Sequence, residues 1–220
     1  MLRNLLILFF AALILPAAAF GQLSDDGKPL VYVTDADITT STLWTSDNVY
    51  VLDGFVFVED GETLTIQPGT IVKALDGQGS DASALVVARG GMIIADGTQE
   101  LPIIFTSIHD DLDDPYDIPF SPVAGEGRGL WGGILILGYA GVGCDETNNE
   151  IEGLPAGDPR AQYGGFDNDD NSGILRYVSI RHGGTELEAA NEINGLTMGA
   201  VGRGTTISHV EVLFNLDDGF

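Results

Sequence analysis

The chain has 220 residues, of which 33 are acidic and 9 are basic, so its formal net charge at pH 7 is −24. A charge of this size and sign repels nucleic acid and anionic membrane surfaces and argues against both as partners. Glycine, with 30 residues, is about twice as frequent as in an average protein, and no segment combines a sustained 3.6-residue apolar period with helix caps, which argues against a helical fold.

The segment 1–21 has the layout of a secretory signal peptide. One basic residue, Arg3, precedes an apolar run over residues 5–15, and small residues lead to a cleavage point between Ala19 and Gln22. A transmembrane anchor is the alternative, but the apolar run is short for a bilayer span. We therefore expect residues 1–21 to be removed, and the protein to be secreted, at the cell surface or extracellular, with no membrane insertion afterwards.

The remaining residues, 22–220, are enough for one domain with a sizeable core. Within them the phrase GETLTIQPGTIVKAL from Gly61 recurs in similar form as ASALVVARGGMIIAD from Ala82, so that Leu85 aligns with Leu64. The same step in the other direction places Leu43 under Leu64. Glycine and asparagine tolerate the left-handed backbone of a tight turn and stand between the apolar runs. The pattern indicates short strands joined by turns, with a period of about 21 residues, which lies in the range of solenoid repeats.

Two later phrases repeat with a longer spacing. ILRYVSI and TISHVEV align Leu175 with Ile207 and Val178 with Val210, 32 residues apart. About 21 extended residues can travel roughly 70 Å at about 3.3 Å per residue, enough for one circuit of three short strands and their corners. Stacked circuits of this kind form a parallel β-helix, an all-β solenoid whose inward side chains make continuous apolar ladders. Leucine-rich repeats have a similar length but need an asparagine ladder that is absent here, and propeller blades need roughly twice this period.

Three long insertions interrupt the repeats, at residues 107–129, 144–172 and 183–204. We expect them to be loops at the corners of the solenoid, where binding functions commonly lie. Cys144, the only cysteine, begins the second insertion, so no disulfide can form within the chain.

The second insertion ends in FDNDDNSG, where Asp167, Asp169 and Asn171 alternate before Gly173. A turn with this spacing can direct several oxygens at one hard cation, and Ca²⁺ is the natural candidate cofactor in an exported acidic protein. The pattern departs from an EF-hand loop, because Ser172 stands where that loop has glycine. The alternative is an Asx-rich turn whose side chains bond to their own backbone. Our candidate metal ligands are Asp167, Asp169 and Asn171.

Two other sets of charged residues are candidates for a site. A run of acids in the first insertion could also hold cations, but like charges in sequence are usually only solvated; it comprises Asp110, Asp111, Asp113 and Asp114. The outward positions Arg176, Arg181, His182 and Glu211 could form an active site if adjacent coils stack directly, although outward strand positions are normally polar. We assign no catalytic residue.

Taken in order, several phrases resemble a family of secreted bacterial right-handed parallel β-helix proteins that often carry C-terminal sorting or anchoring domains. These phrases are GETLTIQPGTIVKA, LPIIFTS, GLWGGILILG, DNSGILRYVSIRHGG and GTTISHVEVLFNLDDGF. The resemblance implies a right-handed coil over nearly all of residues 22–220 but brings no established chemistry. It also implies that further coils follow, so that the sequence is the N-terminal part of a longer protein.

We therefore expect an exported structural or adhesive β-helix protein that displays acidic, candidate Ca²⁺-binding loops to an extracellular glycan or surface partner. Two alternatives stay open. One is a polysaccharide-binding or polysaccharide-degrading protein, similar to a lyase or hydrolase. The other is a protein that self-associates through the strand edges at the ends of its β-helix.

Overall fold

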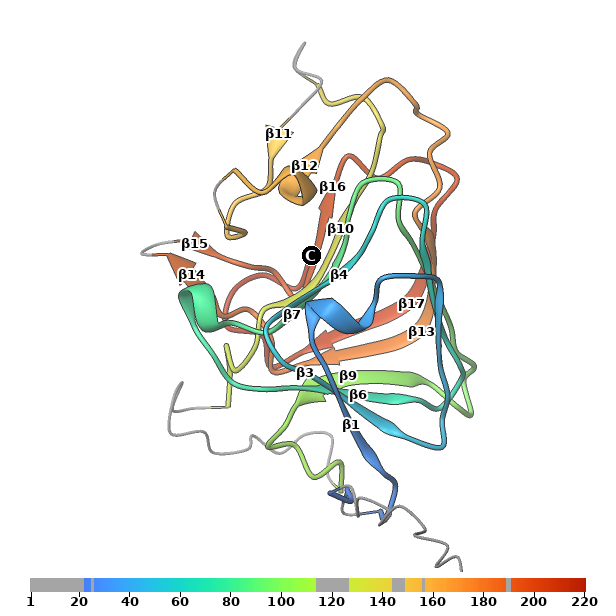
Figure 1. Cartoon of the computed structure of the whole chain (residues 1–220), viewed down its shortest axis with the longest axis vertical. Coiled ribbons are helices and arrows are strands. Elements are labelled where there is room, and N and C mark those ends of the chain that lie inside the picture. Colours follow the sequence, from blue (N-terminus) through green and yellow to red (C-terminus); the bar gives the residue numbers. More distant parts are fainter. Residues whose placement is uncertain (1–21, 25, 114–126, 144–148, 156, 189–190) are drawn as a thin grey trace, which may run out of the picture.

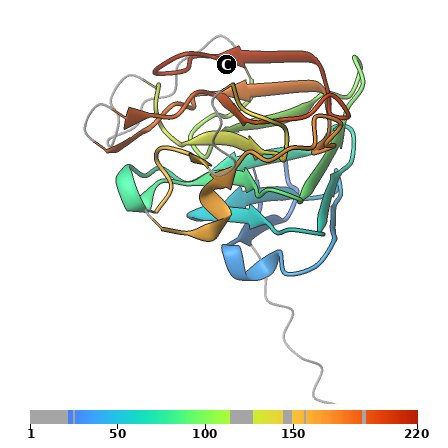
Figure 2. The ribbon, with the colours of Figure 1, turned by 90° about the horizontal axis from the view of Figure 1, so that it is seen from above.

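The computed structural model describes residues 22–220 apart from residues 25, 114–126, 144–148, 156 and 189–190. Its strands wind into stacked coils, seen end-on in Figure 1 and from the side in Figure 2, where the colours follow one another from blue to red. The predicted signal peptide and Cys144 lie outside the described residues. Among the described helices, none is long and apolar enough to cross a membrane.

Each coil runs along three faces, and the strands within a face are parallel. Face 1 contains β2 (Thr42–Trp44), β5 (Thr63–Ile66), β8 (Met92–Asp96) and the first halves of β13 (Gly173–Arg181) and β17 (Thr206–Leu213). Face 2 contains β1 (Leu30–Val33), β3 (Val49–Leu52), β6 (Ile71–Ala74), β9 (Ile103–Ser107) and the second halves of β13 and β17. Face 3 contains β4 (Phe55–Val58), β7 (Ala84–Val87), β10 (Gly133–Leu137) and β16 (Leu196–Gly199).

Inward side chains stack in register from coil to coil, as expected for a solenoid. Each face has its own apolar ladder, and the three ladders meet in one core. The ladder of face 1 is Trp44, Ile66, Ala95, Leu175 and Ile207. The ladder of face 2 is Tyr50, Val72, Phe105, Ile180 and Val212. The ladder of face 3 is Val56, Leu85, Ile134 and Leu196. The fold is the predicted all-β, right-handed parallel β-helix.

The later repeat was predicted in the correct register, but the earlier one was not. Leu175 pairs with Ile207 and Val178 with Val210. Leu64, however, pairs with Ile93, whereas Leu85 lies on face 3, two faces further round the same coil. The two phrases are similar because each describes a strand, a turn and a strand around one corner.

The first coil is also one residue longer than predicted. Leu43 pairs with Thr65, one position further along than the predicted partner Leu64. Because side chains alternate along a strand, a shift of one residue exchanges the inward and outward positions. Trp44 therefore points into the core at 2% exposure, and Leu43 is 54% exposed.

The outer surface of face 3 is covered by the second insertion, which forms a smaller hydrophobic core against it. The insertion contains the hairpin of β11 (Asn149–Glu150) and β12 (Gln162–Tyr163) and the 3-10 turn η3 (Pro159–Ala161). Leu154 and Ala161 pack onto outward residues of face 3 such as Val86 and Leu135. All five residues of β10 are buried as a result, which explains its uninterrupted apolar sequence.

The remaining elements are short. They are the 3-10 turns η1 (Asp35–Asp37) and η2 (Gly79–Asp81) and the antiparallel strands β14 (Glu186–Glu188) and β15 (Asn191–Glu192).

Candidate functional site

A row of polar and charged side chains crosses the outer surface of face 2. Lys73 on β6 pairs in register with Thr106 on β9, and both follow inward ladder residues, so alternation turns them outward. Ser179 and Arg181 on β13 flank the inward Ile180 in the same way. We call the set Lys73, Thr106, Asp110, Ser179, Arg181, His182 and Glu211 the charged row.

The carboxylate of Asp110 lies at the centre of the charged row. Its Oδ2 accepts a hydrogen bond from Thr106 Oγ1 at 2.6 Å, and its Oδ1 accepts one from the Leu112 amide at 2.8 Å. The same Oδ2 lies 3.8 Å from Nη1 of Arg181 and 3.9 Å from Nε2 of His182. Asp110 is only 1% exposed, so the carboxylate is a buried counter-ion.

Lys73 is held by the same segment. Its ammonium group donates to the backbone carbonyl of Asp110 at 2.7 Å. Arg181 donates through Nε to Ser179 Oγ at 2.9 Å, and the Ser179 hydroxyl donates to Glu211 Oε1 at 2.7 Å. Apart from Glu211, which is exposed, the members of the row are between 0% and 7% exposed.

Residues 127–131 cover one end of the charged row. His182 Nδ1 lies 2.7 Å from the Gly127 carbonyl oxygen, and the imidazole ring stacks on Phe214 with centroids 5.4 Å apart. The indole of Trp131 donates to the Arg181 carbonyl at 2.7 Å. These contacts leave His182 buried beneath residues 127–131 and hold the backbone of Arg181 in place.

Arg176 was grouped with these residues in the sequence, but the structure places it elsewhere. It lies on face 1, where Nε and Nη2 bind the two oxygens of Asp96 at 2.6 and 2.7 Å. This bidentate hydrogen bonding holds the pKa of Asp96 below its usual value. The sequence thus predicted the neighbourhood of Arg181, His182 and Glu211 but not the separation of Arg176.

The candidate calcium ligands lie in one exposed turn before β13. Asp167 Oδ1 accepts a hydrogen bond from the Asp169 amide at 3.0 Å, and Asn171 Oδ1 accepts one from the Gly173 amide at 2.9 Å. Asp169 forms an ion pair with Arg203, Nε to Oδ1, at 2.8 Å. Each of the three side chains therefore has a hydrogen-bond or ion-pair partner within the chain.

Within the described part of the chain, no group of three or more histidine, cysteine, aspartate and glutamate residues is arranged to hold a metal ion. Calcium can also take asparagine oxygens as ligands, so calcium binding by Asp167, Asp169 and Asn171 stays a prediction. Of the acids in the first insertion, Asp110 belongs to the charged row, Asp111 accepts from the Asp113 amide at 3.0 Å, and Asp114 lies outside the described residues.

The roles of Lys73 and Thr106 were not predicted from the sequence. A signal for Lys73 was available, because it is one of only two lysines in the chain and stands between apolar residues of a predicted strand. A charged residue at such a position needs a partner. The partner could not be identified from sequence, because Asp110 lies 37 residues away.

Together, the coil and the row define a three-faced parallel β-helix with an internally paired set of charges on one outer face. Residues 36–220 match a family model described as a pectate-lyase like beta helix domain, and the chain belongs to that family. It is thus a polysaccharide-related or extracellular β-helix protein. Searches of curated proteins and of solved structures gave no match.

Proposed function

We propose that the protein is an extracellular structural or adhesive β-helix that does not turn over a polysaccharide through its charged row. The observation that carries the proposal is the burial and mutual pairing of Lys73, Asp110 and Arg181. A group that takes or gives a proton in catalysis must come within hydrogen-bond reach of the substrate. These groups are instead bound to one another, and they fasten the first insertion to face 2.

The adhesive part of the proposal rests on what the molecule presents outward. A rigid solenoid positions its corner loops accurately, and loops on such scaffolds commonly carry binding functions. The net charge of −24 keeps an exported protein soluble and selects against polyanionic partners. Export itself and calcium binding by the loop at Asp167 remain parts of the proposal.

The test is a turnover assay on polygalacturonate, alginate and uncharged glucans, with and without Ca²⁺, that follows both unsaturated products and new reducing ends. We expect no turnover of any of them. Arg181→Met should lower the stability of the protein without changing this result. Turnover that is lost in Glu211→Gln, with the thermal midpoint unchanged, would overturn the proposal and support a lyase or hydrolase.

A further inference from the structure

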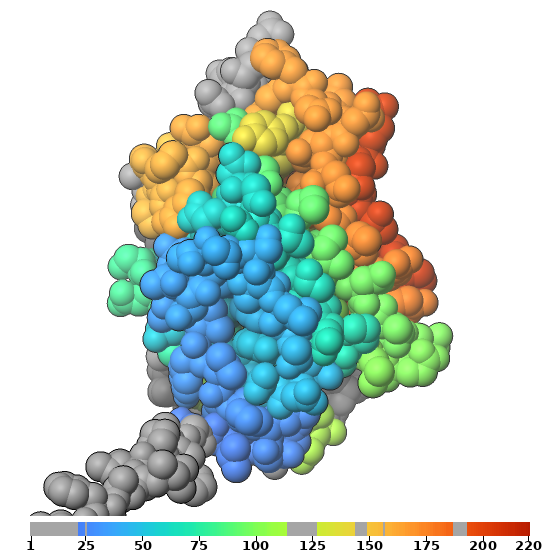
Figure 3. All heavy atoms as spheres, turned by 45° about the vertical axis from the view of Figure 1, so that its right-hand side comes forward, coloured from blue at the N-terminus to red at the C-terminus, as the bar shows by residue number. Residues whose placement is uncertain are grey.

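The corner between face 1 and face 2 changes in length along the solenoid. It has four residues in the first two coils, 45–48 and 67–70, and six in the third, 97–102. In the fourth and fifth coils one residue, Tyr177 or His209, makes the whole corner, because the strands on either side of it are continuous in register. The long corner of the third coil therefore projects beside two short ones, as the green residues do at the edge of the molecule in Figure 3.

This step in corner length creates a groove of about 550 Å³. Gln99 and Pro102 of the long corner form one wall. Tyr177 and His209 form the corner of the next two coils, and Ser179 and Glu211 continue the lining along face 2. At an inter-strand spacing of about 4.8 Å, two coils give the groove a length of about 10 Å, which suits one or two sugar rings.

The two aromatic residues occupy a backbone conformation that their residue types disfavour. Tyr177 and His209 have φ angles of 49° and 54°, in the left-handed region that glycine and asparagine adopt at the lowest cost. Their rings stack with centroids 4.4 Å apart and an interplanar angle of 21°. The one-residue corner explains the φ angle but not the choice of aromatic residues for it, and residues held in a disfavoured conformation are candidates for function.

A second pair in the same conformation provides the contrast. His182 and Phe214 have φ angles of 60° and 53° and also stack. Their reason is structural, because His182 is 1% exposed and lies under the cover of the charged row. His209, by comparison, is exposed, and Tyr177 is partly exposed, and both line an open groove.

The lining has the chemistry that a sugar requires. Small-molecule sites combine aromatic and apolar surface with a few placed polar groups, and a tyrosine offers both a ring face and a hydroxyl. The amide of Gln99 and the carboxylate of Glu211 can exchange hydrogen bonds with sugar hydroxyls. The Ser179–Glu211 hydrogen bond, at 2.7 Å, fixes the carboxylate in place.

The charges around the groove disfavour an anionic glycan. Glu211 lines it, and Glu100 lies on the long corner. The nearby Arg176 is already neutralised by Asp96. Like charges at a binding surface repel one another and so discriminate against the wrong partner. A polyuronate would therefore be repelled by this acidic groove.

We propose that this corner groove binds one or two rings of an uncharged glycan through Tyr177, His209 and Glu211, and that it excludes polyuronates. This proposal rests on the adhesive role proposed above and names the class of ligand that it would bind. It does not depend on the proposed absence of turnover. It differs from the substrate class that the family description suggests, since pectate is a polyuronate.

The test is calorimetric titration of the whole chain with β-1,4-linked hexamers of glucose, mannose, galactose and xylose, and with the hexamer of galacturonate. We expect at least one uncharged hexamer to bind with a dissociation constant of about 1 mM or lower, and the galacturonate hexamer not to bind. Tyr177→Asn should weaken that binding at least about tenfold, while the thermal midpoint stays within a few degrees, because asparagine suits the left-handed corner. Phe166→Asn, at an exposed site away from the groove, is the matched control and should bind as the unmodified chain does.

Three results would overturn the groove proposal: no uncharged hexamer binds, galacturonate alone binds, or Tyr177→Asn binds unchanged. Glu211→Gln gives a second check, because it should keep the uncharged ligand and weaken the discrimination against galacturonate. Turnover of a bound hexamer would contradict the proposed non-catalytic function and leave the groove proposal standing.

Discussion

Asp110 contacts most of the other members of the charged row on the outer surface of face 2. Its carboxylate accepts from Thr106 and Leu112 and lies near Arg181 and His182, while its carbonyl accepts from Lys73. Breaking a buried ion pair by removing one partner is costly, because the other charge stays buried without compensation. The Asp110 side chain is thus one of the groups that attach the first insertion to face 2, and the one whose loss leaves a buried charge unpaired.

Asp110→Asn should therefore lower the free energy of unfolding by about 3–5 kcal/mol. Asparagine keeps the size of the side chain but leaves Arg181 without a buried counter-charge. Urea unfolding monitored by circular dichroism measures the change, and Asp217→Asn, at an exposed position, is the control and should shift it by less than about 0.5 kcal/mol. A loss similar to that of the control would show that the row is not a stabilising network.

At the residue scale, the sequence predicted the register of the later repeat but not that of the earlier one. The inward positions Leu175 and Val178 were correct because the later repeat, with its extra length confined to one loop, preserves the alternation. Leu43 and Trp44 were reversed because the first coil is longer by one residue. A turn can accommodate one additional residue without changing the apolar pattern of the strands beside it, so the position of the additional residue could not be found from the sequence.

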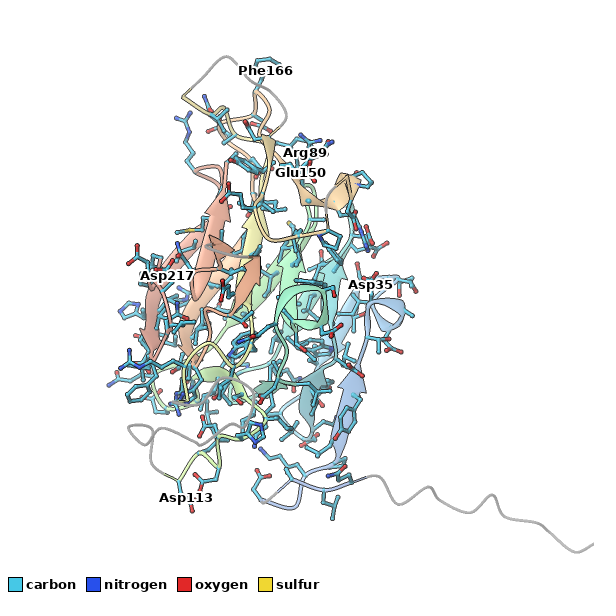
Figure 4. All side chains as sticks on the ribbon, turned by 90° about the vertical axis from the view of Figure 1, so that its left-hand side faces the viewer. Asp35, Arg89, Asp113, Glu150, Phe166 and Asp217 are labelled. Carbon is cyan, nitrogen blue, oxygen red and sulfur yellow. The ribbon has the colours of Figure 1, made fainter. Side chains whose placement is uncertain are left out.

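At the scale of elements, two arginines attach the second insertion to face 3. Arg160 contacts Asp35 at 2.8 Å and Glu59 at 3.0 Å, donates to both oxygens of Asp158, and lies 3.7 Å above the ring of Phe57. Figure 4 shows Asp35 beside the first coils, well away in sequence from the insertion.

Arg89 makes a second attachment, to the Gly164 carbonyl at 2.7 Å and over the ring of Tyr139. Arg89 and Glu150 both lie at the upper end of the molecule in Figure 4. Arg160 belongs to the second insertion, and Arg89 follows β7 of face 3. Their polar contacts therefore hold the insertion against face 3 in addition to the second hydrophobic core.

Replacing Arg160 by methionine should loosen the insertion without unfolding the coils. Hydrogen exchange should become faster in residues 149–165 and stay unchanged in β5 and β6, and the free energy of unfolding should fall by about 1–3 kcal/mol. Arg203→Met is the matched control, because its ion pair with Asp169 is exposed at both partners and such pairs contribute little. Equal exchange in the two variants would contradict the role of Arg160.

The same contact predicts a dependence on pH. The hydrogen bonds from Arg160 hold the pKa of Asp158 below its usual value. A carboxyl whose pKa is lower in the folded state contributes stability above its unfolded pKa of about 3.9 and loses it as the pH falls through the folded pKa. The difference in unfolding free energy between the unmodified chain and Arg160→Met should thus be largest at neutral pH and shrink below about pH 4. A difference that grows on acidification would show that another group is responsible.

The outer cover of face 3 could not be predicted from sequence. All five residues of β10 are buried, which requires a partner on the outer side of the sheet in addition to the neighbouring strands. That partner is made of scattered residues such as Leu154 and Ala161, which have no period of their own. The pairing of Asp110 with Lys73 could not be predicted either, because it depends on how the first insertion folds back over face 2.

At the scale of the whole molecule, acidic side chains outnumber basic ones by 33 to 9. Self-repulsion of this kind opposes the compact state and is screened by salt. The thermal midpoint should therefore rise when NaCl is increased from about 10 mM to about 150 mM, over which the Debye length falls from about 30 Å to about 8 Å. A midpoint that falls with salt would mean that attractive ion pairs, such as those of Arg160 and the charged row, outweigh the net repulsion.

At fixed ionic strength the screening of charges is constant, so an effect of Ca²⁺ binding on the thermal midpoint can be measured separately. Ca²⁺ at the turn before β13 would compete with Arg203 for Asp169. The amides that bond to Asp167 Oδ1 and Asn171 Oδ1 use one lone pair each, so both side chains keep acceptor capacity for a cation. The calcium prediction therefore requires Ca²⁺ to raise the thermal midpoint more than Mg²⁺ does, because Mg²⁺ demands a more rigid shell. At about 100 times its dissociation constant, Ca²⁺ should add about 2.7 kcal/mol. Asp167→Asn should abolish the difference between Ca²⁺ and Mg²⁺, and Arg203→Met should enlarge it by releasing Asp169 from its ion pair. If the two ions have equal effects on the unmodified chain, the calcium prediction is wrong, and the turn is a set of Asx side chains that bond to their own backbone.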